Sequence, residues 1–449
     1  MKKFIAKIKQ IFSIEELRTK ILNTLLFLLI YRIGTFIVLP GIDGELLSGA
    51  QKQPEGLLGI VNIFAGGAFG RGAIFALGIM PYISASIVIQ LLGIAVPHFQ
   101  RLQKEGEDGR RKLNQYTRVL TIAITAVQAL GYLYNITGKA DNRFALLFVT
   151  QPDLMSESTF MIVNVILLVA GTMFTMWLGE RITDKGLGNG ISLIIMIGIV
   201  DRLPEALIYE FGAKSSKLPL LMIELAVWVG IILSVILLVQ GVRKISVNYA
   251  KRIEGNRQYG GARQYIPLKV NASGVMPIIF AQALMFIPPT IATNMSDPGS
   301  FLRSLSDYTS FWYNFIFASL IILFTYFYTA IMVNPNQMAD DMKKNGGFIP
   351  GIKPGRDTSH YIDNVLSRIT LPGAVFLALI AILPSLAQGL GNINPNFAQF
   401  YGGTSLLIMV GVVLDTLQQI ESHLLMRHYD GLMKAGRIKG RAGTVGASI

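Results

Sequence analysis

The chain has 449 residues, of which 52% are hydrophobic and only 15% charged, with a mean hydropathy of +0.50. Soluble proteins carry about 25% charged residues, so this sequence lacks the charge needed to cover a water-facing surface. Its 40 Lys and Arg outnumber 27 Asp and Glu, which gives a net charge of +13. An apolar, basic chain is typical of a multi-span membrane protein with basic loops on one side. The lack of cysteine excludes disulfides, thiolate metal sites and cysteine nucleophiles.

The first 20 residues predict an amphipathic segment that lies on a membrane surface. Six Lys and Arg are interleaved there with apolar residues, a pattern shared by signal-peptide n-regions and interfacial helices. The following apolar run, 21–40, is too long for a signal-peptide core, and no Ala-x-Ala cleavage signal lies nearby. We therefore expect this run to be retained as the first membrane span.

Ten segments approach the roughly 20 apolar residues that a helix needs to cross about 30 Å of hydrocarbon. The sequence thus predicts an all-α integral membrane protein with ten transmembrane helices. The spans are 21–40, 72–94, 118–136, 159–178, 191–208, 218–241, 271–292, 311–332, 369–386 and 404–421. Ten spans put both termini on one side, and the loops of that side hold 31 Lys and Arg, against 8 in the opposite loops. The positive-inside rule then predicts that both termini are cytoplasmic.

Five plus five spans would form two halves of opposite orientation, as in many transport proteins. We predict an N-terminal half over 21–208, a C-terminal half over 218–421 and a cytoplasmic tail over 422–449. The second span of each half is irregular, since glycines interrupt 57–94 and three prolines interrupt 271–292. Interrupted helices at matching positions mark a transport pathway, but Pro and Gly are also common in ordinary membrane helices.

The apolar segment 57–71 is too short to span a membrane and ends in a run of glycines. Segments of about 14 residues are more often re-entrant or interfacial. Irregular backbone at membrane depth persists only inside protein or beside water. Both a movable plug in a pore and an amphipathic loop on the outer leaflet fit these properties.

The loop count assigns 201–217 to a connection, which leaves three ionisable residues inside the spans. Glu224 and Asp415 lie near the ends of their spans, where a side chain can reach an interface. Arg32 lies in the middle of the first span and requires a partner, either backbone carbonyls or a polar cluster. Three isolated charges argue against a proton-coupled or ion-coupled transporter.

No pattern in the sequence supports an enzyme. The chain has no P-loop, and its four histidines lack the i,i+4 spacing of a metal site. No nucleophile–base arrangement can be argued either. We predict no catalytic residue, no metal and no cofactor.

Several long motifs, in order from about residue 15 to 440, identify the chain as similar to the SecY family of bacterial protein-conducting channels. They include Phe64–Arg71 (FAGGAFGR), Phe75–Ser86 (FALGIMPYISAS), Lys104–Lys112 (KEGEDGRRK), Gly186–Ser192 (GLGNGIS), Val247–Arg252 (VNYAKR), Phe348–Gly355 (FIPGIKPG) and Gly402–Leu407 (GGTSLL). The resemblance implies two inverted five-helix halves around an hourglass pore, with 57–71 as a re-entrant plug in the outer funnel. It also implies a lateral gate that opens toward lipid for signal sequences and nascent helices.

The resemblance further implies roles for particular residues. An aliphatic pore ring would fall on Ile79, Ile83, Ile191, Ile195, Ile279 and Ile408. The plug would include Asn62, Phe64, Gly66, Gly67, Phe69 and Arg71. The lateral gate would include Ser84, Gln90, Gln128, Asn271, Ile287 and Ile291. Without the resemblance, the isoleucines would be ordinary packed or lipid-facing side chains.

Two basic cytoplasmic loops, 242–270 and 333–368, would dock the machine that drives transport. The resemblance implies that rRNA phosphates or an acidic motor surface are contacted by Lys251, Arg252, Arg257, Lys353 and Arg356. The family usually has Arg where this chain has Lys353, and a lysine cannot reproduce the bidentate fork of an arginine. The neighbouring Arg356 is in a position to compensate.

These inferences together predict the channel-forming subunit of a Sec translocase in the bacterial inner membrane. Its implied partners are small SecE and SecG membrane subunits, the SecA motor ATPase, the ribosome, signal sequences and nascent chains. Two alternatives remain open at this point. A secondary transporter would need polar groups at the membrane midplane, and an insertase without a through-pore would not need a plug.

Overall fold

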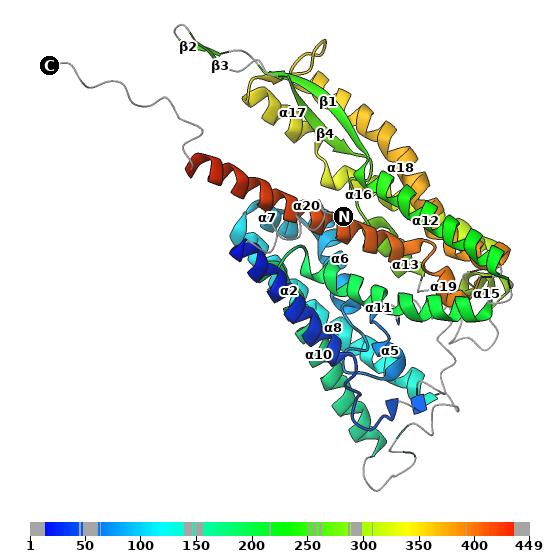
Figure 1. Ribbon diagram of the computed structural model, residues 1–449. Coiled ribbons are helices and arrows are strands. Elements are labelled where there is room, and N and C mark those ends of the chain that lie inside the picture. The colour runs from blue at the N-terminus through cyan, green and yellow to red at the C-terminus, as the bar shows by residue number, and fades with distance from the viewer. Residues whose placement is uncertain are drawn as a thin grey trace.

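The computed structural model describes residues 14–44, 46–47, 62, 64–138, 146, 149, 156–214, 217–249, 252–254, 257–259, 263–285, 288, 299–307, 309–391 and 393–434. The amphipathic segment up to residue 13 and the tail from 435 onward lie outside these residues. The helices are α2 (Glu15–Gly34), α5 (Ala68–Arg71), α6 (Met80–Ala95), α7 (Pro97–Lys104), α8 (Glu107–Gly138), α10 (Glu157–Lys185), α11 (Gly190–Ala213), α12 (Leu218–Gln240), α13 (Met276–Met285), α15 (Ser300–Ser306), α16 (Phe311–Met332), α17 (Pro335–Lys344), α18 (Arg356–Gly391), α19 (Pro395–Ala398) and α20 (Gly403–Lys434). Figure 1 shows their arrangement.

A helix lies within each of the ten predicted spans, but fewer qualify as membrane-spanning. Six helices of the described part are long and apolar enough to cross a bilayer, namely α8, α10, α12, α16, α18 and α20. The pair α6 and α7, bent by 101°, makes a possible seventh span. By length and composition, the described residues therefore do not reach the predicted count of ten.

The first two predicted spans have different bounds from those expected. The helix α2 ends at Gly34, because the chain then turns so that Leu39 N donates to the carbonyl of Gly72 at 2.8 Å and Ile74 N to that of Ile37 at 2.9 Å. Turns then occupy the residues before α6, where Gly72 and Gly78 have positive φ angles of 67° and 53°. Glycine adopts this conformation without strain, so α6 begins only at Met80.

The assignment of 201–217 to a connection is wrong. The helix α11 continues to Ala213, because its apolar residues resume after three charged ones. Asp201, Arg202 and Glu205 are therefore on a helix that was predicted to contain no charge.

The prediction that Glu224 reaches an interface is also wrong. Its carboxylate is buried and forms an ion pair with Lys214, which follows α11 and also pairs with Glu210 at 2.7 Å. The backbone N–H of Asn394 donates to the second oxygen of Glu210 at 3.2 Å. A buried carboxylate is tolerated when a counter-charge compensates its lost hydration. Asp415, in contrast, is exposed on α20.

The basic loop 242–270 departs locally from the predicted helical architecture. This loop contains four of the five described strands, namely β1 (Val242–Tyr249), β2 (Arg252–Glu254), β3 (Arg257–Tyr259) and β4 (Arg263–Lys269), and β5 (Gly347–Phe348) follows in the second basic loop. One antiparallel sheet has the order β4-β1-β5, and β2 pairs with β3 separately. The strands β1 and β4 lie beside α17, and β2 and β3 lie beyond them at the tip of this loop (Figure 1).

The sheet forms because alternate side chains of β1 are apolar and pack against α17 and α18. Ile245 and Val247 are buried in one cluster with Met342 of α17 and Ile362 of α18. This period of two is that of a strand with one buried face. The pairing of Asn248 with Phe348 joins the two basic loops into one unit.

A central apolar cluster connects elements of both predicted halves. It contains residues of α2, α11, α19 and α20, and residues of α6 and α12 pack against it. One hydrogen bond reinforces the connection between the halves, because Gly188 N donates to Gln419 Oε1 at 2.8 Å. Within the C-terminal half, Trp228 Nε1 donates to the Phe400 carbonyl at 2.9 Å. Two further clusters form around α8 with α10 and around α16 with α18.

Candidate functional site

The structure brings the six predicted ring isoleucines into one continuous apolar region. Ile79, Ile195 and Ile408 are buried in the central cluster, and Ile83 and Ile191 pack against it. Ile279 of α13 belongs with Ile83 to a neighbouring cluster, so Ile83 packs against both.

A helix cap fixes the position of two of these side chains. Asn189 precedes α11, and its Oδ1 accepts hydrogen bonds from the backbone N–H groups of Ile191 at 3.1 Å and Ser192 at 3.4 Å. Such an N-cap satisfies donors that have no partner within the helix. Ile191 and Ile195 are four residues apart and therefore share one helix face.

The described part of the predicted plug is a compact turn that leads into the isoleucine region. Gly66 and Gly67 have left-handed φ angles of 61° and 79°. Asn62 closes the turn, since its carbonyl accepts from Gly67 N at 2.7 Å and its Oδ1 accepts from Gly70 N at 2.9 Å. Phe64 is buried in the same central cluster as Ile79 and Ile408. Residues 57–61 and Ile63 lie outside the described part.

The other end of the plug is held by α8. The rings of Phe69 and Tyr132 lie with their centroids 4.7 Å apart, and both side chains are buried. The Tyr132 hydroxyl donates to the carbonyl of Phe69 at 2.7 Å. Phe64 and Phe69 thus anchor the plug in two different apolar clusters.

The partner required by Arg32 is Asp201, with which it forms an ion pair. Arg32 Nη1 also donates to the carbonyl of Gly66 at 3.2 Å, and Arg71 Nη2 donates to the same oxygen at 3.2 Å. The sequence reasoning missed Asp201 because it ended the apolar part of α11 too early. The signal was present, because most residues from 203 to 211 are apolar, with Glu205 and Glu210 as the charged exceptions.

A second candidate feature is the seam between α6 and the pair α13 and α16. Ile87, Phe280 and Tyr328 form a small buried cluster across it, and the ring centroids of Phe280 and Tyr328 are 5.2 Å apart. The Tyr328 hydroxyl donates a hydrogen bond to Gln90 Oε1. Gln90 was predicted as a gate residue, whereas Tyr328 was not.

The three other predicted gate residues that the structure describes do not bridge this seam. Ser84 donates to the Met80 carbonyl within its own helix at 3.1 Å. Asn271 Oδ1 accepts from Ser273 at 3.3 Å, and Gln128 is exposed on α8. The gate isoleucines at 287 and 291 lie outside the described residues.

The predicted docking residues occupy the region of the two basic loops. Lys353 and Arg356 are exposed before and at the start of α18, and Thr358 donates to the Lys353 carbonyl at 2.8 Å. Arg252 and Arg257 lie on the β2–β3 hairpin. Lys251 lies outside the described residues.

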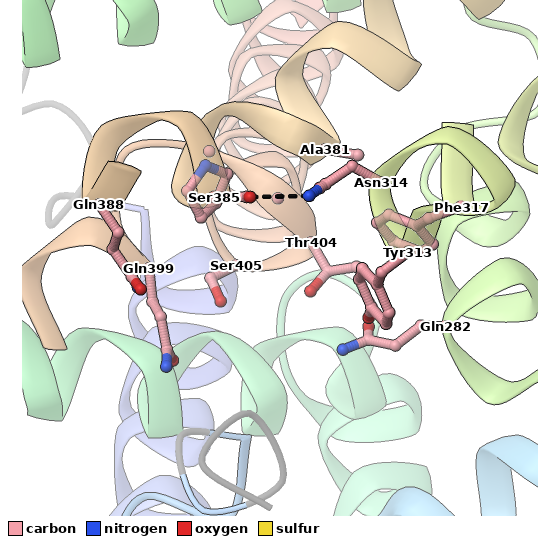
Figure 2. Close-up of a pocket in the computed structure, with 13 residues that line it drawn as sticks. Gln282, Tyr313, Asn314, Phe317, Ala381, Ser385, Gln388, Gln399, Thr404 and Ser405 are labelled. Atoms are coloured by element: carbon pink, nitrogen blue, oxygen red, sulfur yellow. Dashed lines mark hydrogen bonds between the residues drawn. The ribbon is translucent and has the colours of Figure 1, made fainter. Parts of the chain in front are cut away.

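The C-terminal half also contains a pocket of about 70 Å³ that no predicted site residue lines. Figure 2 shows side chains of α13, α16, α18 and α20 around it, with Asn314 donating to Ser385 Oγ at 2.8 Å. Its amide and hydroxyl groups come from Gln282, Tyr313, Asn314, Ser385, Gln388, Gln399, Thr404 and Ser405. Its lining carries no ionisable carboxylate or amine, and no group of three metal-binding side chains occurs in the part of the chain that the structure describes.

This arrangement is the fold of a protein-conducting membrane channel. A solved structure described as that of a protein conducting channel shares the fold with a TM-score of 0.63 at 18% identity, and the match covers 95% of both chains. Canine Sec61 in a ribosome-channel complex gives a TM-score of 0.61 at 17% identity, again over 95% of both chains.

The sequence comparisons define the family. The family model for SecY matches residues 73–417. The protein translocase subunit SecY of Chlamydia trachomatis serovar D is 42% identical, over 97% of this chain and 100% of that protein. The corresponding subunit of Bacillus licheniformis is 44% identical, over 95% and 99%. The chain belongs to the SecY family, and is a multi-pass membrane channel subunit of a protein translocase rather than an enzyme.

Proposed function

We propose that unfolded secretory chains cross the membrane through the isoleucine region and that 57–71 seals it at rest. The observation that carries this proposal is the burial of Phe64 from the plug among Ile79, Ile195 and Ile408. Branched aliphatic side chains offer no fixed hydrogen bond or charge, so they hold no particular substrate sequence. A narrow apolar constriction also blocks ions by dewetting when it is closed.

The seam between α6 and the pair α13 and α16 serves as the lateral gate for nascent membrane helices. Two features support this role. The cluster of Ile87, Phe280 and Tyr328 is apolar and small, so an apolar signal helix can replace its contacts. The hydrogen bond from Tyr328 to Gln90 adds a polar contact that hydrocarbon cannot replace. Such a bond between membrane helices contributes about 0.6 kcal/mol.

The protein works in the bacterial inner membrane, with both termini in the cytoplasm. The excess of Lys and Arg in the loops on that side supports this orientation. SecE and SecG are its small partners, and SecA or the ribosome docks on the joined loops 242–270 and 333–368. Exposed Lys353 and Arg356 support contacts with phosphates or acidic side chains. The canine relative of known structure is itself part of a ribosome-channel complex.

Photo-crosslinking during arrested transport tests the pore assignment. A photoreactive residue is placed at position 83 or 191, with position 127 as a control because Val127 is 71% exposed on α8. A secretory chain is then stalled halfway across. We expect crosslinks from 83 and 191 and none from 127. Crosslinks from 127 alone would refute the pore assignment.

A further inference from the structure

Three arginines from three separate elements converge on one turn of the plug. Arg32 comes from α2, Arg71 from α5 and Arg202 from α11. The first two donate to the carbonyl oxygen of Gly66 at 3.2 Å. A side chain at Gly67 would overlap the guanidinium groups of Arg71 and Arg202, so the latter two cations both lie against this glycine.

The ring of Phe36 holds two of these cations close together. The guanidinium carbon of Arg71 lies 4.3 Å from the centre of the ring, and that of Arg32 lies 4.9 Å from it. Cations are attracted to the face of an aromatic ring. This attraction and the shared carbonyl offset part of the repulsion between the two arginines.

Two carboxylates oppose these three cations among the residues that the structure describes. Asp201 pairs with Arg32, and Glu205 pairs with Arg202 at 2.9 Å while remaining 50% exposed. The cluster therefore retains one net positive charge, and Arg71 has no carboxylate of its own in this part of the chain. Burial and the charges of Arg202 and Arg32 lower the pKa of Arg71, as expected for a cation held beside like charges.

Two donors of the cluster also lack an acceptor within the described residues. They are Arg71 Nη1 and Arg202 Nε, both buried. A buried donor without an acceptor is unfavourable, especially on a charged group. The two donors belong to the same two arginines that lie against Gly67.

We propose that Arg71 and Arg202 bind one small monovalent anion of the chloride class beside Gly67. The anion accepts from both donors and neutralises the single excess charge. A divalent oxyanion has more acceptors and more charge than the cluster can match. Because Arg71 is in the plug and Arg202 is in α11, the bound anion connects the plug to the wall of the channel. Only this last consequence rests on the proposed function of 57–71 as a plug.

Thermal unfolding of the purified translocase complex tests the site. Sodium chloride replaces sodium gluconate at constant ionic strength. We expect a saturable rise in the unfolding temperature, because a ligand that binds only the folded state stabilises it by mass action. Arg71→Gln and Arg202→Gln should abolish the rise, and Arg303→Gln, at an exposed position of α15, should retain it. Identical responses in all four proteins would overturn the proposal.

A second variant changes the affinity in the opposite direction. Glu205→Gln removes a half-exposed carboxylate from the cluster, so it should bind chloride more tightly, with half-saturation at a several-fold lower concentration. This variant keeps both arginines, so its result does not depend on whether the Arg71→Gln and Arg202→Gln proteins fold. A weaker or unchanged affinity would contradict the site.

Anomalous diffraction from crystals of the complex grown in bromide locates the ion directly. We expect one peak between Arg71 and Arg202 that is absent in Arg202→Gln. Peaks at exposed positions alone would mean an adventitious ion only and would refute the site. Rubidium efflux through the resting channel, in chloride and in gluconate, then tests the plug separately. A bromide peak with equal, low efflux in both salts would retain the anion site and reject its part in holding the plug. High efflux from the parent in both salts would reject the plug function.

Discussion

Arg32 and Asp201 form an ion pair between α2 and α11, and the same arginine donates to the carbonyl of Gly66 in the plug. The pair thus couples the position of the plug to the contact between two long helices. Both side chains are about three-quarters buried, so solvent screens the pair only in part.

We expect Asp201→Asn to loosen the plug. The amide can still accept a hydrogen bond, but the loss of the charge should cost about 1 kcal/mol, which shifts a closed–open equilibrium roughly fivefold. Resting rubidium efflux from proteoliposomes measures the change. Asp415→Asn on the exposed face of α20 is the matched control and should behave like the parent. An Asp201→Asn channel as tight as the parent would show that the pair does not hold the plug.

We expect Gly67→Ala to open the channel more strongly. The position has a φ of 79° and faces two guanidinium groups, so an added methyl group must displace either the turn or the arginines. Resting efflux should rise at least as much as in Asp201→Asn. Gly131→Ala serves as the control, because a side chain there meets no atom within 4 Å. Equal efflux from both variants would contradict the packing of the plug.

Tyr328→Phe should lower the barrier to lateral opening. The variant keeps the ring against Phe280 but loses the donor to Gln90, a bond between membrane helices that contributes about 0.6 kcal/mol. Reporters with weakened signal sequences should be transported several-fold faster, as measured by protease protection. Tyr326→Phe on the same helix is the control. If the two variants transport such reporters equally well, the hydrogen bond has no part in the gate.

Asn189→Ala should destabilise the start of α11. Loss of an N-cap costs about 1 kcal/mol of stability. Ile191 and Ile195 lie in the first two turns after this cap. The unfolding temperature of the complex should fall, whereas Asn189→Asp, which retains an acceptor, should remain close to the parent. A fall of equal size in both variants would mean that the capping bonds contribute nothing.

Lys214→Met should be the most destabilising of these substitutions. The variant leaves the buried carboxylates of Glu210 and Glu224 without their shared counter-charge, and breaking a buried ion pair costs roughly 3–5 kcal/mol. Thermal unfolding measures the loss. Lys217→Met, an exposed lysine three residues later, should have almost no effect, and a similar loss there would point to general charge effects.

The ring isoleucines and the plug glycines were predicted from the family resemblance, which rests on local motifs that are each one continuous stretch of chain, and their roles stay predictions. Phe64 and Ile79, for example, are separated by a single turn-rich segment. Contacts between distant segments were not predictable in this way. Tyr328 lies 238 residues from Gln90, and nothing in the local pattern of α16 distinguishes it from neighbouring aromatic residues.

The charged residues of α11 were predicted to lie outside a helix for a related reason. An apolar count treats Asp201 and Arg202 as the end of a span, although a charge can remain on a membrane helix when an opposite charge from another helix meets it. The strands of loop 242–270 were missed because helical hydropathy dominated the prediction. The alternation of Ile245 and Val247 with polar residues indicates a strand once it is considered separately.

The apolar character of the seam of Ile87, Phe280 and Tyr328 makes its opening toward lipid less costly in free energy than its opening toward water. Lipid tails contact these side chains about as favourably as the side chains contact one another. Opening the seam toward lipid therefore costs little apolar contact energy. Parting it beside water would expose the same surface at about 25 cal/mol per Å². As the proposed lateral gate, the seam would act as a partition boundary, and a passing segment would leave sideways only if it is apolar enough to replace the contacts of these three residues.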